Sequence, residues 1–217
     1  MFTGIVEETG TVKEVKRARN SMQLSIYCNE VLTETAKGDS IAVNGVCLTV
    51  AYFTDSYFVA DVMPETYFAT ALSELTLGNE VNLERAIAAN GRFGGHFVTG
   101  HVDGTGKITA KRQSANALYM DIQIEQNLLR FVMNKGSITV DGTSLTVFDV
   151  KDDRFSISLI PVTQKDSVIA RKQMGSKVNV ECDILVKYME QLLFKKNQYH
   201  SGDGLTIDKL ASSGFLI

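Results

Sequence analysis

An internal repeat constrains the fold of this chain more than any other feature. Residues 41–50 read IAVNGVCLTV and residues 138–147 read ITVDGTSLTV, a spacing of 97 residues. The same spacing separates the only two prolines, Pro64 and Pro161. The opening segment FTGIVEETGTV returns at Val98 as VTGHVDGTGKI with a spacing of 96. We therefore expect two similar domains of roughly 95 residues followed by a short tail.

Short segments rich in β-branched residues occupy matched positions in the two halves. Some alternate apolar and polar residues, as 156–159 do, which is typical of a half-buried strand. Asn44-Gly45 and Asp141-Gly142 predict tight hairpins, because the turn needs positive φ at both central residues. About six strands per half favour a small closed barrel. The clearest predicted strands are 22–28, 40–43, 47–53, 58–63 and 80–85, then 118–124, 137–140, 144–150, 154–160 and 177–182.

Two short helices are expected between the strands of each half. The first should end at Lys37-Gly38 and, in the second half, at Lys135-Gly136. The second should begin after a threonine and end at a glycine, since threonine is a good N-cap and glycine a good C-cap. These cap positions are Thr66 and Gly78, and Thr163 and Gly175.

The repeat stops after Asp183, where the segment ILVKYMEQLLFKKN begins. Leu185, Met189 and Leu192 fall on one face at helical spacing. This extra helix packs against copies of itself in an oligomer or against its own barrel. The predicted fold is all-β, with two tandem homologous six-stranded Greek-key barrels, short helices and a C-terminal amphipathic helix. We expect domains at 1–96 and 97–183, followed by an oligomerisation helix and tail at 184–217.

Composition excludes several classes of partner. The formal net charge is -3, aromatic residues are 8% and tryptophan is absent, so a barrel that binds single-stranded nucleic acid is not expected. No run approaches the roughly 18 apolar residues that a membrane span needs, and the N-terminus lacks a signal peptide. Three cysteines without a C-x-x-C pair indicate neither disulfides nor zinc. We expect a cytoplasmic protein without membrane or nucleic-acid partners.

Positions at which the two halves differ point to chemistry. Cys47 corresponds to Ser144, and Ile5 corresponds to His101. Cys47 is a small buried hydrophobe or a thiol that touches ligand. His101 is a surface-turn residue or a general acid/base, for which its ordinary pKa near 6.5 is suited. No metal site is expected, because the three histidines lack acidic or thiolate residues at usable spacing.

Several ordered motifs together resemble the riboflavin synthase family, of the trimeric α type. They are MFTGIVEETG, NGVCLTV, DVMPET, GRFGGHFVTGHVDG and DGTSLTV, and the resemblance covers residues 1 to about 190. It implies two Greek-key barrels and a C-terminal helix that joins three subunits. It also implies that two molecules of 6,7-dimethyl-8-ribityllumazine exchange a four-carbon unit, giving riboflavin and 5-amino-6-(D-ribitylamino)uracil without a cofactor.

The resemblance implies two substrate pockets, which meet between subunits. Residues expected to line the first are Gly4, Ile5, Val6, Cys47, Leu48, Thr49, Asp61, Val62, Met63, Pro64, Glu65 and Thr66. Residues expected to line the second are Gly100, His101, Val102, Lys135, Ser144, Leu145, Thr146, Ile160, Pro161, Val162, Thr163, Gln164 and Lys165. Residues 1–3 should reach into the neighbouring site.

The resemblance also assigns roles and alternatives. His101 with Ser144 and Thr146 should assist proton transfer or activate the nucleophile, Cys47 should touch the donor ring, and Asp183 should serve as a ribityl or proton-relay carboxylate. Lumazine synthase, which supplies the substrate, is a possible further partner. Some relatives of the fold are non-catalytic antenna proteins that bind one lumazine or flavin. Because both halves keep polar residues at the matched positions, the enzyme is the favoured reading.

Overall fold

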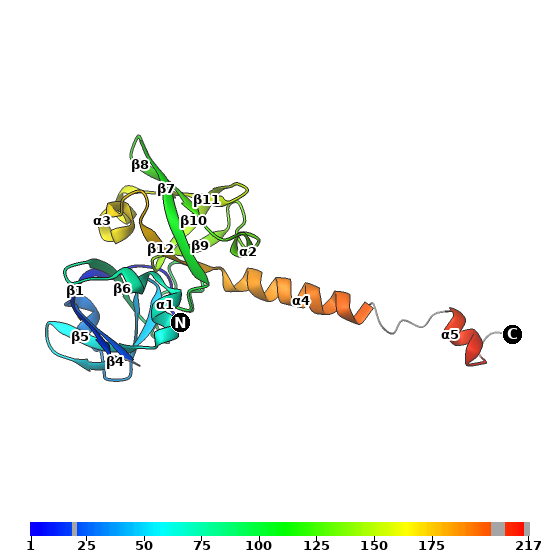
Figure 1. Ribbon diagram of the computed structural model, residues 1–217, viewed down its shortest axis with the longest axis horizontal. Coiled ribbons are helices and arrows are strands. Elements are labelled where there is room, and N and C mark those ends of the chain that lie inside the picture. The colour runs from blue at the N-terminus through cyan, green and yellow to red at the C-terminus, as the bar shows by residue number, and fades with distance from the viewer. Residues whose placement is uncertain (19–20, 201–206, 215–217) are drawn as a thin grey trace. The chain divides into compact units, whose positions relative to one another are not determined.

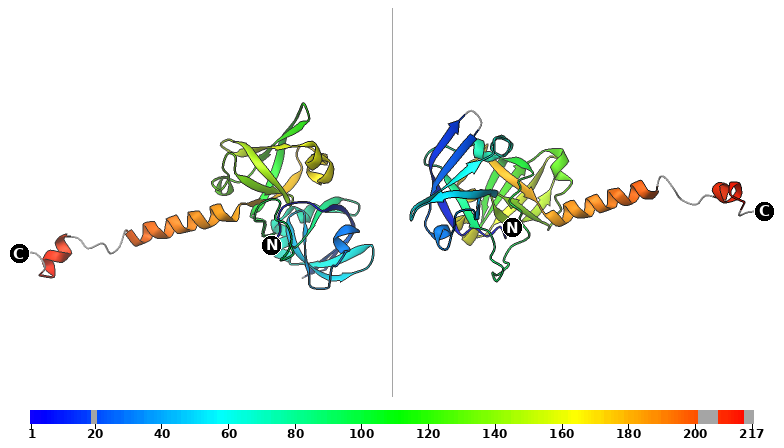
Figure 2. Two further views of the ribbon diagram at one scale, coloured as in Figure 1. Left: turned by 180° about the vertical axis from the view of Figure 1, so that it is seen from behind. Right: turned by 90° about the horizontal axis from the view of Figure 1, so that it is seen from below.

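The computed structural model describes residues 1–18, 21–200 and 207–214 of the chain. The chain divides into a compact unit, Met1–Ile184, and a second unit, Leu185–Ile217. The first unit holds two barrels, coloured blue to cyan and green to yellow in Figure 1. Both views of Figure 2 show these barrels side by side.

Each half of the first unit closes into a six-stranded antiparallel barrel. The strand order is β1-β2-β5-β4-β3-β6 in the first barrel and β10-β11-β8-β7-β12-β9 in the second, which is the same Greek-key ring. The first barrel contains β1 (Glu8–Ala18), β2 (Ser21–Tyr27), β3 (Ser40–Val43), β4 (Val46–Phe53), β5 (Tyr57–Val62) and β6 (Glu80–Arg85). The second contains β7 (Gly104–Ser114), β8 (Ala117–Gln123), β9 (Ser137–Val140), β10 (Thr143–Val150), β11 (Arg154–Leu159) and β12 (Lys177–Cys182).

All ten predicted strands are confirmed to within one residue at either end. The long first strand of each barrel, β1 and β7, is not among them. Both strands carry a register shift, between Val12 and Glu14 and between Ile108 and Ala110. A β-bulge inserts one extra residue and so interrupts the alternation of apolar and polar side chains. The period-two signal is therefore lost where these strands bend.

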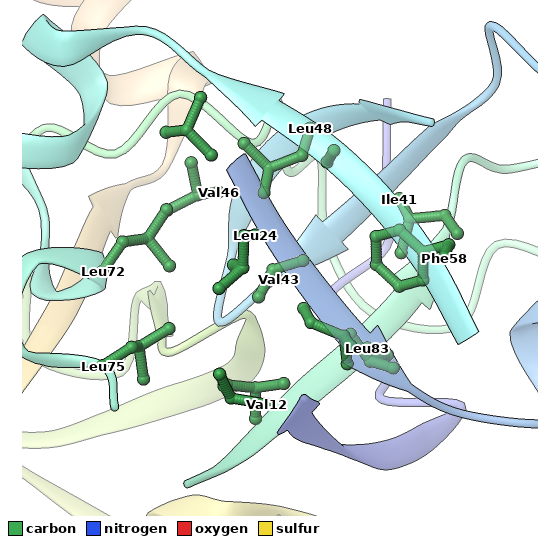
Figure 3. Packing of buried hydrophobic residues seen from close by; sticks show 14 of the residues in the cluster. Val12, Leu24, Ile41, Val43, Val46, Leu48, Phe58, Leu72, Leu75 and Leu83 are labelled. Carbon is green, nitrogen blue, oxygen red and sulfur yellow. The ribbon is translucent and has the colours of Figure 1, made fainter. Parts of the chain in front are cut away.

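Each barrel encloses its own apolar core. Figure 3 shows the first core, in which Leu24, Phe58 and Leu83 from three strands point toward one another. Phe58 and its counterpart Phe155 are both fully buried. Burying a side chain of this size stabilises the fold by roughly 1.5–3 kcal/mol. The repeated apolar positions therefore build two matched cores.

The hairpin turns are as predicted. Asn44 and Gly45 have φ of 45° and 79°, and Asp141 and Gly142 have φ of 46° and 78°. Positive φ at both central residues matches the twist of the flanking strands, so these turns fix the register of β3 with β4 and of β9 with β10.

The predicted helix boundaries are wrong in both halves. Near residue 30 the chain forms only the short 3₁₀ helix η1 (Glu30–Leu32), and its counterpart is α2 (Gln126–Leu129), so both end well before the predicted glycines. The second predicted helix is in fact two short ones. They are α1 (Pro64–Ala69) with η2 (Ala71–Glu74), and α3 (Pro161–Asp166) with η3 (Val168–Arg171).

The capping residues explain these corrections. α1 and α3 begin at a proline, which suits the first helical turn because its missing N–H needs no partner there. Thr66 and Thr163 therefore lie inside a helix. The side chains that cap a helix are Thr70 and Ser167, which accept hydrogen bonds from backbone amides of η2 and η3. Each half therefore has a hydroxyl side chain as an N-cap, as predicted, but the cap lies four residues after the predicted one, at Thr70 in place of Thr66 and at Ser167 in place of Thr163.

The Lys-Gly pairs before β3 and β9, Lys37-Gly38 and Lys135-Gly136, are not equivalent in the structure, because they are offset by one residue. The Gly38 amide donates to the carbonyl of Val50, and the Lys135 amide donates to the carbonyl of Val147, both at 2.9 Å. Lys135 therefore corresponds to Gly38. It adopts φ of 65° at a position where the first barrel has a glycine at 98°. A lysine with positive φ costs roughly 1 kcal/mol relative to glycine.

The second unit contains α4 (Ile184–His200) and α5 (Ile207–Ser212), with the first residue of α4 still in the barrel unit. The predicted helix after Asp183 is confirmed. Leu185, Met189 and Leu192 are 54%, 63% and 68% exposed. Over the described ranges, none of the helices combines the length and apolar character required to traverse a lipid bilayer.

A pseudo-twofold axis relates the barrels, because two residues contact their own counterparts. Phe2 and Val98 exchange backbone hydrogen bonds of 2.7 and 3.2 Å, and they occupy equivalent positions in the repeat. Gly45 lies against Gly142 so closely that a Cβ on either would be 2.7 Å from the nitrogen of the other. A contact between equivalent residues must lie near the symmetry axis, so these two contacts define it.

Candidate active site

The site begins with the alternation of side chains along β4 and β10. In β4, Val46, Leu48 and Val50 are buried in the barrel, while Cys47 is half-buried and Thr49 is exposed on the outer side. The equivalent strand β10 buries Leu145 and Val147 and turns Ser144 and Thr146 outward. We call these outer surfaces the first face (Cys47, Thr49) and the second face (Ser144, Thr146).

The structure reverses the predicted grouping of the opening segments, residues 2–6 and 98–102. The carbonyl of Gly4 accepts a hydrogen bond of 2.7 Å from the Ser144 amide, in the second barrel. The carbonyl of Gly100 accepts one of 2.9 Å from the Cys47 amide, in the first barrel. Gly4 therefore lies beside the second face and Gly100 beside the first, whereas the site prediction groups each segment with its own half. Which ligand pocket each segment lines stays a prediction.

Each opening segment is nevertheless bound to its own barrel by a buried glutamate. Glu84 of β6 accepts hydrogen bonds from the amide and hydroxyl of Thr3 and from the Gly4 amide, at 2.7, 2.8 and 3.0 Å. Glu181 of β12 binds Thr99 and Gly100 in the same way, at 2.7, 2.7 and 3.0 Å. Burial raises the pKa of the Glu84 carboxyl, against the lowering effect of these donors.

The two glycines permit the close approach of the barrels. Gly4 and Gly100 have φ of 76° and 81°. A Cβ at Gly4 would lie 2.7 Å from Cβ of Ser144, and one at Gly100 would lie 2.6 Å from Cβ of Cys47. Only glycine fits both the conformation and the space. Ile5 and His101, which directly follow these glycines, are exposed.

The second face contains a histidine, His96, that is not among the site residues predicted from the sequence. His96 Nδ1 lies 2.7 Å from Ser144 Oγ, and its Nε2 lies 3.1 Å from Thr139 Oγ1. The His96 amide donates to the Thr3 carbonyl at 3.1 Å, so the opening segment helps to fix the ring. Burial lowers the pKa of His96, and the nearby charge of Asp183 opposes this shift. A neutral imidazole is therefore positioned to exchange a proton with Ser144.

The two faces have the same geometry but different chemistry. Where the first face has Cys47 and Ala42, the second has Ser144 and Thr139 at equivalent positions of the repeat. Asp183, which is half-buried, corresponds to Ala86. His96 lies in the segment between the two repeated blocks. Comparison of Thr139 with Ala42 is the sequence signal that could have drawn attention to this site.

The first three residues of the chain differ in burial. Phe2 is fully buried beside Ala42 and Val98, with Cys47 packed against this small cluster. Thr3 is buried as well, and only Met1 among the first three residues is exposed. Phe2 therefore supports the first face from behind, whereas Thr3 lies beside His96 of the second face. That residues 1–3 reach a neighbouring site stays a prediction.

Several other predicted lining residues do not face a pocket. The side chains of Leu48, Val62 and Leu145 are buried in the barrel cores, so they can contribute only through the backbone. Met63, Ile160 and Val162, by contrast, are 67%, 60% and 64% exposed at the starts of α1 and α3. The remaining predicted positions along 61–66 and 160–165, together with Lys135 and Val102, are at least partly exposed.

A cavity of about 720 Å³ lies elsewhere on the first barrel. It is lined by Ile5, Ser40 and the segment after β6, and the ion pair between Arg85 and Glu7 at 2.6 Å borders it. Cys47, Thr49, Ser144 and Thr146 are not part of this cavity. Within the described ranges, no group of three His, Cys, Asp or Glu side chains is arranged to hold a metal ion.

Comparison with known proteins agrees with this arrangement. Residues 3–86 and 99–183 each match a family described as the lumazine binding domain. The riboflavin synthase of Bacillus subtilis (strain 168) is 52% identical over 99% of this chain and its own full length. That of Actinobacillus pleuropneumoniae is 47% identical over the same share of both chains.

Solved structures of LumP show a similar fold. LumP complexed with riboflavin superposes with a TM-score of 0.78 and 26% identity, over 84% of this chain and 99% of that chain. LumP complexed with 6,7-dimethyl-8-(1'-D-ribityl) lumazine gives 0.76 at the same identity and coverage. With two lumazine binding domains and riboflavin synthases as full-length relatives, this chain belongs to the riboflavin synthase family.

Proposed function

We propose that this enzyme is a transferase that converts two molecules of 6,7-dimethyl-8-ribityllumazine into riboflavin and 5-amino-6-(D-ribitylamino)uracil, the last step of riboflavin biosynthesis. One lumazine donates a four-carbon unit, which the other accepts, so all atoms of both substrates appear in the two products. Full-length relatives at up to 52% identity support this reaction. The lumazine and riboflavin bound in LumP support the choice of ligands.

The observation that carries this proposal is the pair of faces with one geometry and two chemistries. A reaction between identical molecules needs two similar sites, because each must bind the same ring system. It also needs a difference between them, because one molecule donates and the other accepts. The first face offers Cys47, Thr49 and His101, while the second offers Ser144, Thr146 and His96. Duplication followed by divergence at these positions provides both requirements.

The protein's main contribution is orientation and proton movement. The methyl group at C7 of the substrate is acidified by the conjugated ring, so no metal or organic cofactor is required. Holding two rings in register can lower a barrier by roughly 7–11 kcal/mol. We assign proton transfer on the second face to Ser144 with His96, assisted by Thr146 and Asp183. His101 assists proton transfer from the edge of the first face, where Cys47 contacts a ring.

The active site is proposed to join the first face of one subunit to the second face of the next in a homotrimer. Thr49 and Thr146 are exposed in the single chain, which leaves each face open for a facing subunit. The apolar stripe of α4 is the proposed trimer contact. The protein is proposed to act in the cytoplasm, where lumazine synthase supplies its substrate and is a possible docking partner.

The direct test is to add 6,7-dimethyl-8-ribityllumazine to the purified full chain with no cofactor and record riboflavin absorbance. We expect riboflavin to form over many equivalents of protein, at half the amount of lumazine consumed. Product that stops at one equivalent, or that requires an added reagent, would contradict the proposal.

A second candidate function is a non-catalytic antenna protein that holds one chromophore. The observation that favours this candidate is the similarity to LumP, which is 26% identical to this chain and whose structures hold a lumazine or riboflavin. The same assay separates the two functions. A fluorescent lumazine bound at one per chain, without any riboflavin formed, would identify an antenna protein.

A further inference from the structure

The contact between the two barrels has a symmetric centre. We call this contact the seam. It is formed by η2 and β6 of the first barrel against η3 and β12 of the second. Asn82 and Asn179, both buried, are equivalent residues at its centre. Asn82 Oδ1 accepts from the Val168 amide at 2.8 Å, and Asn179 Oδ1 accepts from the Ala71 amide at 2.7 Å. Each amide group also donates to a turn of the opposite barrel, at 2.7 and 2.8 Å.

The rim of the seam is antisymmetric in charge. Glu80 binds Arg171 at 3.0 Å, and Glu74 binds Lys177 at 3.1 Å. Glu74 is the counterpart of Arg171, and Glu80 is the counterpart of Lys177, each at a spacing of 97. Both rim positions are thus acidic in the first barrel and basic in the second. The charges pair across the axis, acid with base, in both places.

We infer that the seam is a recognition surface specific for an unlike barrel. The bonds that the two asparagines share, to a backbone amide and to a turn carbonyl of the opposite barrel, could form in a pair of like barrels as well, because both modules carry the same residue there. Asn82 alone also donates to Thr143 and Ser167, at 3.3 and 3.1 Å. The ion pairs of the rim could not form in a pair of like barrels. Two first barrels would place Glu74 against Glu80 of the copy, and two second barrels would place Arg171 against Lys177. Like charges in contact disfavour the wrong partner, as complementary ones favour the right one.

The energy of each rim pair is modest, since their side chains are 37% to 56% exposed. The rim therefore selects between partners more than it stabilises the fold. A pair of like barrels would replace two attractive contacts with two repulsive ones. The free-energy difference between the two pairings is therefore larger than the contribution of either ion pair. Salt screens exposed charges, so the selection weakens at high ionic strength.

This selection decides which residues share a face. In the observed pairing, Gly100, which His101 follows, lies beside Cys47, and Gly4 and His96 lie beside Ser144. A pair of first barrels would instead place Gly4 and Ile5 beside Cys47, and that face would contain no histidine. The consequence for catalysis rests on the proposed function. The specificity of the seam does not.

The test uses three variants of the full chain. Glu74→Lys with Glu80→Lys makes the rim wholly basic, Arg171→Glu with Lys177→Glu makes it wholly acidic, and the fourfold variant reverses its polarity. Hydrogen exchange at the amides of Ala71 and Val168 reports opening of the seam, because both donate across it. We expect exchange roughly tenfold faster in each twofold variant at low salt, falling toward the wild-type rate in 1 M salt.

A matched control for the basic twofold variant makes the same change in net charge away from the seam. Asp55 and Asp152 are equivalent, exposed turn residues, and D55K with D152K should leave the exchange of both amides unchanged. The fourfold variant should regain most of the wild-type protection. Twofold variants that behave like this control would overturn the inference, as would a fourfold variant that remains as open as the twofold ones. Riboflavin formation, measured separately, tests only the consequence for the faces.

Discussion

At the scale of single residues, the contact between His96 and Ser144 distinguishes the second face from the first. The ring nitrogen and hydroxyl oxygen are 2.7 Å apart, with Thr139 on the far side of the ring. We expect Ser144→Ala and His96→Gln each to lower kcat by roughly tenfold, because the reaction also depends on orientation. If the two residues act as one unit, the double variant should be no slower than either single one. Independent, multiplying effects would contradict this pairing.

The pKa of His96 leads to a pH dependence of stability. Burial lowers it below its ordinary value of 6.5 in the folded protein. As the pH falls through 6.5, the unfolded chain binds a proton that the folded chain does not, so stability present above this pH is lost on acidification. Urea unfolding at pH 7.5, 6.5 and 5.5 should show a smaller loss for His96→Gln than for the wild type. Equal losses in both proteins would argue against the lowered pKa.

A buried ion pair in the second barrel has a natural control in the first. The Asp141 carboxylate is fully buried, and its Oδ2 lies 2.6 Å from Lys172 Nζ, without another hydrogen bond in the described part of the chain. The first barrel has Asn44 and Leu75 at these positions. Lys172→Leu should cost about 2–3 kcal/mol, because it leaves a buried charge without its partner. Adding Asp141→Asn, which restores the first-barrel pair, should recover more than half of that loss in denaturant unfolding.

At the scale of elements, most strands and the helix α4 were predictable, whereas the bounds of the short helices between strands were not. Strands such as β3 and β9 recur with β-branched residues and are followed by turns that only Asn-Gly or Asp-Gly form easily, so two independent signals agree. The short helices carry no comparable periodicity, and their ends depend on which residue supplies the cap. Thr70 and Thr66 offer the same hydroxyl, and only the tertiary structure selects Thr70.

The helix α4 carries the prediction that belongs to this scale. Its apolar stripe includes Leu192, which is 68% exposed in the single chain. Burying a leucine on association contributes roughly 1.5–3 kcal/mol. Leu192→Glu should therefore shift a trimer toward monomers in size-exclusion chromatography with light scattering. Gln191→Glu introduces the same charge at the next residue and should leave the assembly intact. If both variants stay trimeric, the stripe is not the contact.

At the scale of the whole molecule, the repeat predicted two barrels but not how they share residues. A spacing of 97 shows which positions are equivalent, but it does not show whether a segment packs on its own barrel or on the other one. That choice depends on the contacts of Gly4 with Ser144 and of Gly100 with Cys47, which are distant in sequence. His96 escaped prediction for the same reason, since its partners lie 43 and 48 residues away.

The central claim is that each chain has two unequal lumazine sites, one on each face. The most direct measurement is calorimetric titration of the full chain with riboflavin, the product, which does not react further. We predict two binding events of different affinity per chain. His101→Ala with Cys47→Ala should weaken one event, and Ser144→Ala with His96→Gln should weaken the other. A single event per chain, or two events that weaken together in both variants, would contradict the claim.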